Sequence, residues 1–168
     1  METTQITIRP AREGDEALLA AIQTESWRQA FAGILKPEVL EPMTDPQRAK
    51  EAYHRLLREK TGKGYLLERN GTPQFITWWG PVRDRQEAET AELFCIHSLP
   101  DHRREGLGSR MLEFVLQDMR QAGYQKAMLW VFAENQKARR FYEKHGFGAA
   151  KEKRISLGAE EIRCEKWL

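Results

Sequence analysis

A glycine-bearing segment between a strand-like run and an amphipathic stretch is the part of the sequence whose residues could do chemistry. Residues 100–109 read PDHRREGLGS. A glycine loop that enters a helix presents unpaired backbone N–H groups at the positive end of the helix dipole, and such groups bind phosphate. The spacing alone leaves two alternatives open: a phosphate-binding loop, or tight-turn glycines at the head of a structural helix.

Two widespread nucleotide-binding motifs do not fit this segment. The dinucleotide fingerprint G-x-G-x-x-G requires a third glycine where Met111 stands, and the segment follows three strand-like runs of antiparallel type. A P-loop sequence, G-x-x-x-x-G-K-[ST], occurs nowhere in the chain. Both kinds of nucleotide site are therefore disfavoured.

The elements that must position the segment follow from the spacing of apolar residues. The pattern predicts strands at about 5–9, 64–69, 72–80, 91–98, 126–132, 150–157 and 161–168, and helices at about 15–26, 45–62, 106–122 and 136–145. Antiparallel hairpins come early and late, with strand–helix–strand units in the middle. We therefore expect an α/β fold of the mixed α+β type, with a central sheet of about six to seven strands and helices on both faces.

Element boundaries rest on capping and turn residues. These are Asp15, Asp45 and Asn135 as helix N-caps, and Asn70-Gly71 and Gly158-Ala159 as hairpin turns. The stretch 27–43 contains one glycine and two prolines, so we expect it to be irregular, with only short helical pieces.

The composition fits one domain spanning residues 1–168. The 27 Lys and Arg and 25 Asp and Glu residues are interspersed and leave a net charge of +2, which gives no electrostatic case for nucleic acid. No run approaches the roughly 18 apolar residues of a membrane span, and the N-terminus lacks a signal-peptide pattern. Two widely spaced cysteines, Cys95 and Cys164, fit a reducing, cytoplasmic setting.

Two segments match the motifs of one family. RREGLG at 103–108 matches [QR]-x-x-G-x-[GA] in register, and the run from Asn135 to Phe147 is similar to N-x-x-A-x-x-x-Y…GF. On these motifs, over about residues 90–148, the chain resembles the GNAT superfamily of N-acetyltransferases. The resemblance implies acetyl-coenzyme A as cosubstrate, an amine as acceptor, and no metal ion.

The resemblance also implies which residues bind the cofactor. In the family, backbone N–H groups of the glycine loop hold the pyrophosphate, and the preceding strand pairs with the pantetheine amides, here by position at Ile96 and Ser98. Glu105 stands where many members have a basic residue or glycine, a departure that would weaken cofactor binding. The implied residues are Ile96, His97, Ser98, Arg103, Arg104, Glu105, Gly106, Leu107, Gly108, Ser109 and Asn135.

Two residues are candidates for catalysis, each with a structural alternative. Tyr142 lies where the family places a tyrosine that protonates the leaving thiolate, and its alternative is a core aromatic residue beside Phe141. Glu92 matches a glutamate that takes the proton of the amine directly or through water, and its alternative is an ion pair with a nearby arginine. Strand alternation predicts His97 on the face opposite Glu92, so the two are not expected to act together. Cys95 and His97 have no second Cys/His pair with which to form a metal site.

Three aromatic residues are expected to reach the acceptor pocket: Trp27, Phe31 and Trp78. Because Trp78 and Trp79 are adjacent on a strand, only one of them can line the pocket, and core packing is the alternative for each. The amine, on a small molecule or a peptide, is not identified by the sequence. An exposed edge of the C-terminal strands would permit a homodimer.

Two other classes of function stay open at this point. A non-catalytic acyl-coenzyme A-binding regulatory module would keep the glycine loop and need neither Tyr142 nor Glu92. A structural or partner-binding domain would use the loop only to start a helix, and coenzyme A would then not stabilise it against heat.

Overall fold

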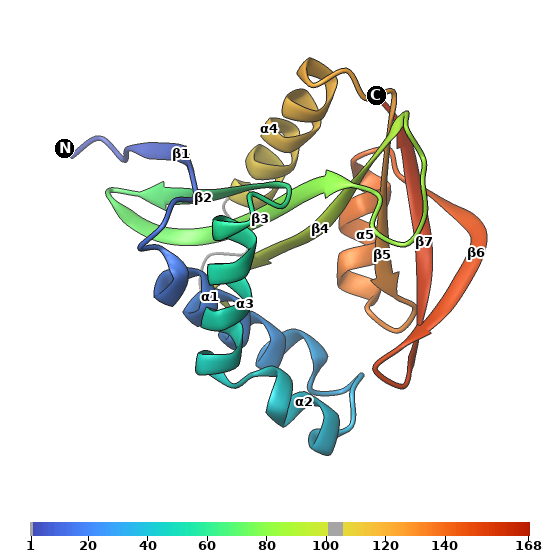
Figure 1. The fold of residues 1–168 in the computed structure, drawn as a ribbon, viewed down its shortest axis with the longest axis horizontal. Coiled ribbons are helices and arrows are strands. Elements are labelled where there is room, and N and C mark those ends of the chain that lie inside the picture. The colour runs from blue at the N-terminus through green and yellow to red at the C-terminus, as the bar shows by residue number, and fades with distance from the viewer. Residues whose placement is uncertain (1, 101–105) are drawn as a thin grey trace.

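The computed structural model describes residues 2–100 and 106–168. Its strands are β1 (Ile6–Pro10), β2 (Lys63–Arg69), β3 (Thr72–Pro81), β4 (Thr90–Ser98), β5 (Lys126–Phe132), β6 (Gly148–Ser156) and β7 (Ala159–Trp167). Its helices are α1 (Glu16–Phe31), α2 (Pro37–Met43), α3 (Pro46–Arg58), α4 (Leu107–Gln121) and α5 (Gln136–Lys144). The prediction of six to seven strands with helices on both faces is confirmed (Figure 1).

The seven strands form one sheet in the order β1-β2-β3-β4-β5-β7-β6. β4 and β5 are parallel neighbours joined by α4, and every other neighbouring pair is antiparallel. β7 lies between β5 and β6, so the second strand–helix–strand unit, β5-α5-β6, skips one position in the sheet. The predicted central position of β4 is confirmed.

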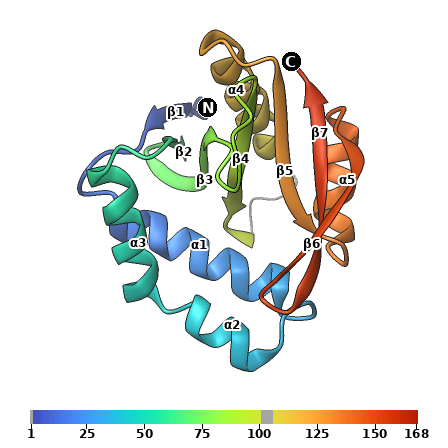
Figure 2. The same cartoon turned by 45° about the vertical axis from the view of Figure 1, so that its right-hand side comes forward.

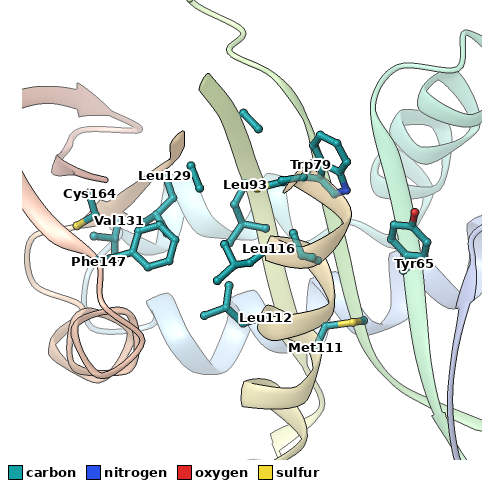
Figure 3. Packing of buried hydrophobic residues seen from close by; sticks show 14 of the residues in the cluster. Tyr65, Trp79, Leu93, Met111, Leu112, Leu116, Leu129, Val131, Phe147 and Cys164 are labelled. Carbon is teal, nitrogen blue, oxygen red and sulfur yellow. The ribbon is translucent and has the colours of Figure 1, made fainter. Parts of the chain in front are cut away.

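Two hydrophobic clusters cover opposite faces of this sheet. On one face, α4 packs Met111, Leu112 and Leu116 against β3, β4, β5 and β7, as Figure 3 shows. On the other face, Leu19 of α1 and Tyr53 of α3 pack against β2 and β3. Burial of these apolar side chains supplies most of the driving force for holding the helices on the sheet.

Two sequence-based expectations near the N-terminus hold only in part. α1 continues past Ser26 to Phe31, because the residues after Trp27 include no helix breaker before Gly33. Asp15 is the N-cap residue of α1, as predicted, but its carboxylate makes no capping hydrogen bond; it accepts the backbone N–H of Arg12 and pairs with Arg9 at 2.8 Å. Salt-bridge formation outcompetes the capping role that the residue type suggested.

The later cap and turn predictions hold with one exception. Asp45 accepts the N–H of Gln47 at the start of α3, and Asn135 accepts the N–H of Ala138 at the start of α5. Asn70 and Gly71 form the β2–β3 turn with φ angles of 50° and 80°, as a type I′ hairpin requires. The last hairpin turns at residues 157–158, one position before the predicted pair.

Within residues 2–100 and 106–168, no helix has the length and apolar character needed to cross a membrane. The same part of the chain gathers no group of three or more His, Cys, Asp and Glu side chains that could hold a metal ion. Cys95 and Cys164 are free thiols, one packed against each hydrophobic cluster.

Candidate active site

The two parallel strands in the middle of the sheet part after a short paired region. β4 and β5 pair only at Thr90–Lys126, Ala91–Ala127 and Glu92–Met128. Beyond these pairs β4 remains bonded to β3 and β5 to β7, and Figure 2 shows the two strands diverging toward their C-terminal ends. An opening lined by backbone on both sides therefore lies in the centre of the sheet.

The open side of β4 presents backbone hydrogen-bonding groups. The N–H of Leu99 donates to the carbonyl of Gln74 at 3.1 Å, on the β3 side. Since ladder bonds alternate along an antiparallel pair, the N–H and C=O groups of Ile96 and Ser98 point away from β3 and into the opening. An extended ligand that carries amides could pair with them as an additional strand.

The start of α4 presents donors beside this opening. Gly106 has a φ of 73°, a left-handed conformation that favours glycine, and it is the N-cap of α4. The first hydrogen bond within the helix runs from the N–H of Arg110 to the carbonyl of Gly106 at 3.1 Å. The N–H groups of Leu107, Gly108 and Ser109 therefore have no partner within the helix, which is the arrangement that binds phosphate.

A cavity of about 820 Å³ extends from this helix end to α1, α2 and α3. Its wall includes Gly108 of α4 at one end and Met43 of α2 at the other, together with the open segments of β4 and β5. The volume lies within the range usual for small-molecule sites. Both candidate catalytic residues, Glu92 and Tyr142, line this one cavity.

A β-bulge in β4 sets which side chains enter the cavity. Trp78 pairs with Cys95 and Trp79 pairs with Leu93, so Phe94 is an extra residue on β4. An extra residue reverses the alternation of side chains beyond it. His97 therefore lines the cavity together with Glu92, and the prediction that strand alternation separates them is wrong.

Aromatic rings from α1 close the cavity over the ends of β4 and β5. The Trp27 indole N–H donates to Nε2 of His97 at 3.2 Å, and the Trp27 ring meets Phe31 edge-on at 5.0 Å between centroids. Phe31 in turn meets Phe132 of β5 at 5.0 Å. Burial lowers the pKa of His97 to about 4, so this imidazole is neutral at pH 7 and poorly suited to be a base.

Glu92 is buried and ion-paired. Its side chain is 3% exposed, and its carboxylate accepts the backbone N–H of Arg83 at 3.0 Å and the Arg83 guanidinium at 2.7 Å. The guanidinium lies over the Phe94 ring, 4.0 Å from its centroid. The ion pair named as the structural alternative is therefore present, on a side chain that also faces the cavity.

Tyr142 projects from α5 into the same cavity. Its ring packs against Phe141 and Phe147, and burial raises the pKa of its hydroxyl above the usual value of 10. Within the described part of the chain, no side chain or carbonyl accepts a hydrogen bond from this hydroxyl. Tyr142 thus offers a proton that is both retained at neutral pH and free to be donated.

Comparisons with known proteins identify the family. A model of the acetyltransferase (GNAT) family matches residues 20–147. The chain belongs to the GNAT acetyltransferase family. It is 30% identical over 148 residues to a probable N-acetyltransferase of Mycobacterium tuberculosis, covering 88% of this chain and 82% of that protein. It is 26% identical over 143 residues to the spermidine N(1)-acetyltransferase of Thermoplasma acidophilum, covering 84% and 88%.

A solved structure shares the fold of this acetyltransferase. The PaiA N-acetyltransferase of Thermoplasma acidophilum, in complex with coenzyme A, superimposes with a TM-score of 0.78 over 98% of this chain and 99% of that one. The sequence identity is 20%, so this likeness concerns the fold. The family membership and the fold expected from the two sequence motifs are both confirmed.

The acetyltransferase brings some of the implied cofactor residues to the cavity and others near it. Ile96, Ser98, Gly108 and Asn135 line the cavity, whereas the side chain of Leu107 is buried in the α4 cluster and offers only its backbone. Arg103, Arg104 and Glu105 lie outside the described residues. The hydroxyl of Ser109 contacts Nε2 of His145 at 2.9 Å, at the start of α4.

The expected acceptor residues differ in how far they are engaged in the core. Trp27 and Phe31 line the cavity on α1. Trp78 also lies on its wall, but it is 3% exposed and its indole N–H donates to the carbonyl of Thr61 at 2.8 Å. Trp79 points to the other face, where its indole N–H donates to Asp118. The prediction that only one of the adjacent tryptophans lines the pocket is confirmed.

Several cavity residues were missed by sequence reasoning. Arg83 belongs to a charged loop, and Arg154 and Glu161, paired at 3.0 Å, belong to the last hairpin. Phe132 reads as the ordinary apolar end of a strand. The hairpin turn at 157–158 implies that residues near 154 and 161 face each other, but no local pattern brings that hairpin to the cavity.

Proposed function

We propose that this acetyltransferase transfers an acetyl group from acetyl-coenzyme A to a primary amine of a small molecule or peptide by direct attack. The observation that carries the proposal is the opening between β4 and β5, which meets the unpaired N–H groups of α4 in one cavity. A phosphate-bearing ligand with an amide-containing arm fits both features. The coenzyme A bound by the similar Thermoplasma structure supports the same choice.

The cavity residues bind two parts of the cofactor, its pyrophosphate and its pantetheine arm. In the proposed complex, N–H groups of Leu107, Gly108 and Ser109 bind the pyrophosphate, and the backbone of Ile96 and Ser98 pairs with the pantetheine amides. Asn135 adds a contact to this arm while it caps α5. When bound, acetyl-coenzyme A would supply an activated thioester carbonyl.

The chemistry then needs one proton acceptor and one proton donor. The amine nitrogen forms a bond to the thioester carbon, the carbon–sulfur bond breaks, and the thiolate takes the proton of the Tyr142 hydroxyl. Glu92 receives the proton that the amine loses, directly or through water. Glu92 Oε1 accepts only the backbone N–H of Arg83 and keeps a lone pair for this proton, whereas Oε2 accepts both guanidinium N–H groups.

The catalytic role of Glu92 is tested by replacing it with Gln. Gln retains an oxygen that can accept the Arg83 N–H but cannot take up a proton. We expect a lower kcat. An unchanged kcat accompanied only by a lower thermal midpoint would assign Glu92 to the ion pair alone.

The whole proposal is tested by the thermal midpoint with and without acetyl-coenzyme A, followed by thiol release with a panel of amines. We expect a rise in the midpoint, since a ligand that binds only the folded state stabilises it, and thiol release that depends on the amine. A rise without thiol release would favour the non-catalytic acyl-coenzyme A-binding module. No rise at millimolar ligand would overturn cofactor binding.

A further inference from the structure

The carboxylates on the cavity wall, which an amine would be expected to contact, are both paired with arginines. Its carboxylates are Glu92 and Glu161, and each is already paired with an arginine, at 2.7 Å to Arg83 and 3.0 Å to Arg154. Both carboxylates are largely buried, with side chains 3% and 10% exposed. No unpaired carboxylate therefore lines the cavity within the described residues.

Positive groups outnumber negative ones on the same wall. Lys137 is a third cation, and no ion pair involves it in the described part of the chain. His97 adds no charge at pH 7, because burial lowers its pKa to about 4. Among the described residues, these three cations against two carboxylates give the wall a net positive charge.

On α1, the cavity wall carries the aromatic side chains of Trp27 and Phe31 together with the polar side chains of Gln23, Ser26 and Gln29. Trp27, Phe31 and Phe132 form a continuous row of edge-to-face rings, and Met43 extends the apolar wall toward α2. The guanidinium of Arg154 lies over the Trp130 ring, 4.2 Å from its centroid. Such a wall stabilises an apolar body by removing its surface from water.

We propose that the acceptor is a monoamine whose amine is carried on an aromatic or other bulky apolar body, and that polyamines are poor substrates. This inference rests on the proposed function and narrows its substrate class. The apolar body packs against the Trp27–Phe31–Phe132 row. Removal of the amine from water favours its neutral, nucleophilic form.

A polyamine would bring further positive charges into the cavity. A chain such as spermidine carries further ammonium groups, and burying an ammonium without a partner carboxylate is costly. The negative charges of Glu92 and Glu161 are already compensated by their arginines, so neither offers a further ammonium group an uncompensated charge. The proposed preference therefore differs from the activity in the name of the Thermoplasma relative, a spermidine N(1)-acetyltransferase.

The direct test compares 2-phenylethylamine with spermidine at saturating acetyl-coenzyme A, one pH and one ionic strength, by initial rates of thiol release. We expect kcat/KM to be at least tenfold higher for 2-phenylethylamine. An equal or higher value for spermidine would overturn the inference while leaving the acetyltransferase proposal intact. If neither amine nor any other acceptor releases thiol, both fail.

A variant of the second ion pair tests the physical reason. Arg154→Met keeps an apolar contact with Trp130 and leaves Glu161 unpaired on the cavity wall. We expect kcat/KM for spermidine to rise several-fold, with little change for 2-phenylethylamine. Adding Glu161→Gln should abolish the gain. No gain for spermidine in a folded Arg154→Met protein would contradict the charge argument.

Two control variants separate this effect from a change in overall charge or fold. Lys153→Met removes one positive charge from the adjacent position, whose side chain is 58% exposed and lies off the cavity, and should leave both substrates unchanged. Glu161→Gln alone removes the carboxylate and should not raise kcat/KM for spermidine. A rise in kcat/KM for spermidine with either control variant would overturn the assignment of the effect to an unpaired Glu161.

Discussion

At the scale of single residues, the Tyr142 hydroxyl combines two properties that a proton donor needs. Burial raises its pKa, so the phenol keeps its proton at neutral pH, and no described group accepts from it in the free protein. Its ring is held by Phe141 and Phe147 on either side. A donor with a fixed ring and an uncommitted proton can act without first breaking another contact.

Tyr142→Phe is therefore expected to remove the donor and little else. We expect kcat to fall on the order of 10²-fold, the lower end of general acid catalysis, with an unchanged thermal midpoint and unchanged acetyl-coenzyme A binding. Thiol-release kinetics and thermal unfolding measure these. Tyr124→Phe, on a half-buried ring that packs on Trp79 away from the cavity, is the matched control. A kcat equal to wild type would return Tyr142 to a packing role.

His97 gives a pH prediction with a definite sign. Its pKa is lowered by burial to about 4, below the usual 6.5, so the unfolded chain binds an additional proton between these values. His97 therefore makes the free energy of unfolding rise as pH increases from 4 to 6.5, by up to about 1.4 kcal/mol per pH unit for one proton. In His97→Asn we expect this part of the slope to disappear.

The measurement for His97 is urea unfolding of the wild type and of His97→Asn at several pH values from 4 to 7. Because the other titrating groups are common to both proteins, the difference between them isolates His97. His54→Asn, on an exposed histidine beside Glu16, is the control. Parallel stability curves for wild type and His97→Asn would show that His97 titrates normally.

The residue scale also shows where sequence reasoning reached its limit. The ion pair predicted as one role for Glu92 is present and the side chain faces the cavity, while its catalytic role stays a prediction, and nothing in the sequence selects Arg83 as the partner. His97 was misplaced because one extra residue, Phe94, reverses the alternation, and bulges leave no local signature in β-forming runs. Contacts such as that of Ser109 with His145 join residues 36 apart and follow only from the fold.

At the scale of elements, an ion-pair network holds the β3–β4 connection against the C-terminal strands. Arg163 of β7 is 4% exposed and pairs with Glu87 of the connection at 2.8 Å and with Glu165 at 3.0 Å. The Arg163 guanidinium lowers the pKa of Glu87, and Lys126 together with Arg163 lowers that of Glu165. The connection that carries Arg83, the partner of Glu92, is thereby attached to β7.

Arg163→Met measures how much this network contributes to the free energy of unfolding. Glu87 keeps Arg85 at 3.2 Å and Glu165 keeps Lys126 at 2.9 Å, so loss of the buried guanidinium is expected to lower the free energy of unfolding at pH 7 by about 2 kcal/mol. Since the pKa values of both carboxylates are lowered in the folded state, their contribution is present above about pH 4.3 and lost as pH falls further. The deficit of the variant should accordingly shrink in acid.

Urea unfolding at pH 7 and at pH 3.5 measures both parts of the Arg163 prediction. Arg120→Met, on the exposed side of α4, removes the same charge without a buried partner and should cost less than about 0.5 kcal/mol. A deficit that is the same at both pH values would mean that lost packing, rather than lost pairing, destabilises the variant.

Another element-scale contact fixes α4, whose N-terminus holds the phosphate in the proposed complex. One carboxylate oxygen of Asp118 accepts the Tyr65 hydroxyl at 2.6 Å and the Trp79 indole N–H at 2.9 Å, which joins α4 to β2 and β3. Hydrogen bonds to a charged acceptor contribute roughly 1.5–3 kcal/mol. Asp118→Asn should therefore lower the free energy of unfolding by about 2 kcal/mol in urea titrations, and Tyr65→Phe, which removes one bond, by less.

Element order was largely predictable because each element is amphipathic in its own period. The turn at Asn70-Gly71 and the caps Asp45 and Asn135 came from local chemistry that no distant contact overrides. α1 ends five residues beyond the predicted end. The sequence permits this extension, because residues 28–32 include no helix breaker, and the contacts of Trp27 with His97 and of Phe31 with Phe132, which a local window does not contain, stabilise it.

At the scale of the whole molecule, the site arises from how two halves of one sheet meet. β1 to β4 form an antiparallel half covered by α1 and α3, and β5, β7 and β6 form a second half. The halves share only three residue pairs between β4 and β5. The expectation of a mixed sheet with helices on both faces is confirmed, whereas the single-domain boundary of 1–168 and a homodimer through the C-terminal edge stay predictions.

This architecture makes a prediction about hydrogen exchange that is confined to the junction. In the free protein the backbone N–H groups of Ile96 and Ser98 point into the opening without a strand partner, so we expect them to exchange fast. Acetyl-coenzyme A should slow their exchange, because its pantetheine arm replaces the missing strand, while amides of β2 paired with β3 change little. Adenosine 3′,5′-bisphosphate, which lacks that arm, should protect only the start of α4. Equal protection of Ile96 and Ser98 by both ligands would mean that the opening closes as a consequence of phosphate binding and that the arm does not pair with β4.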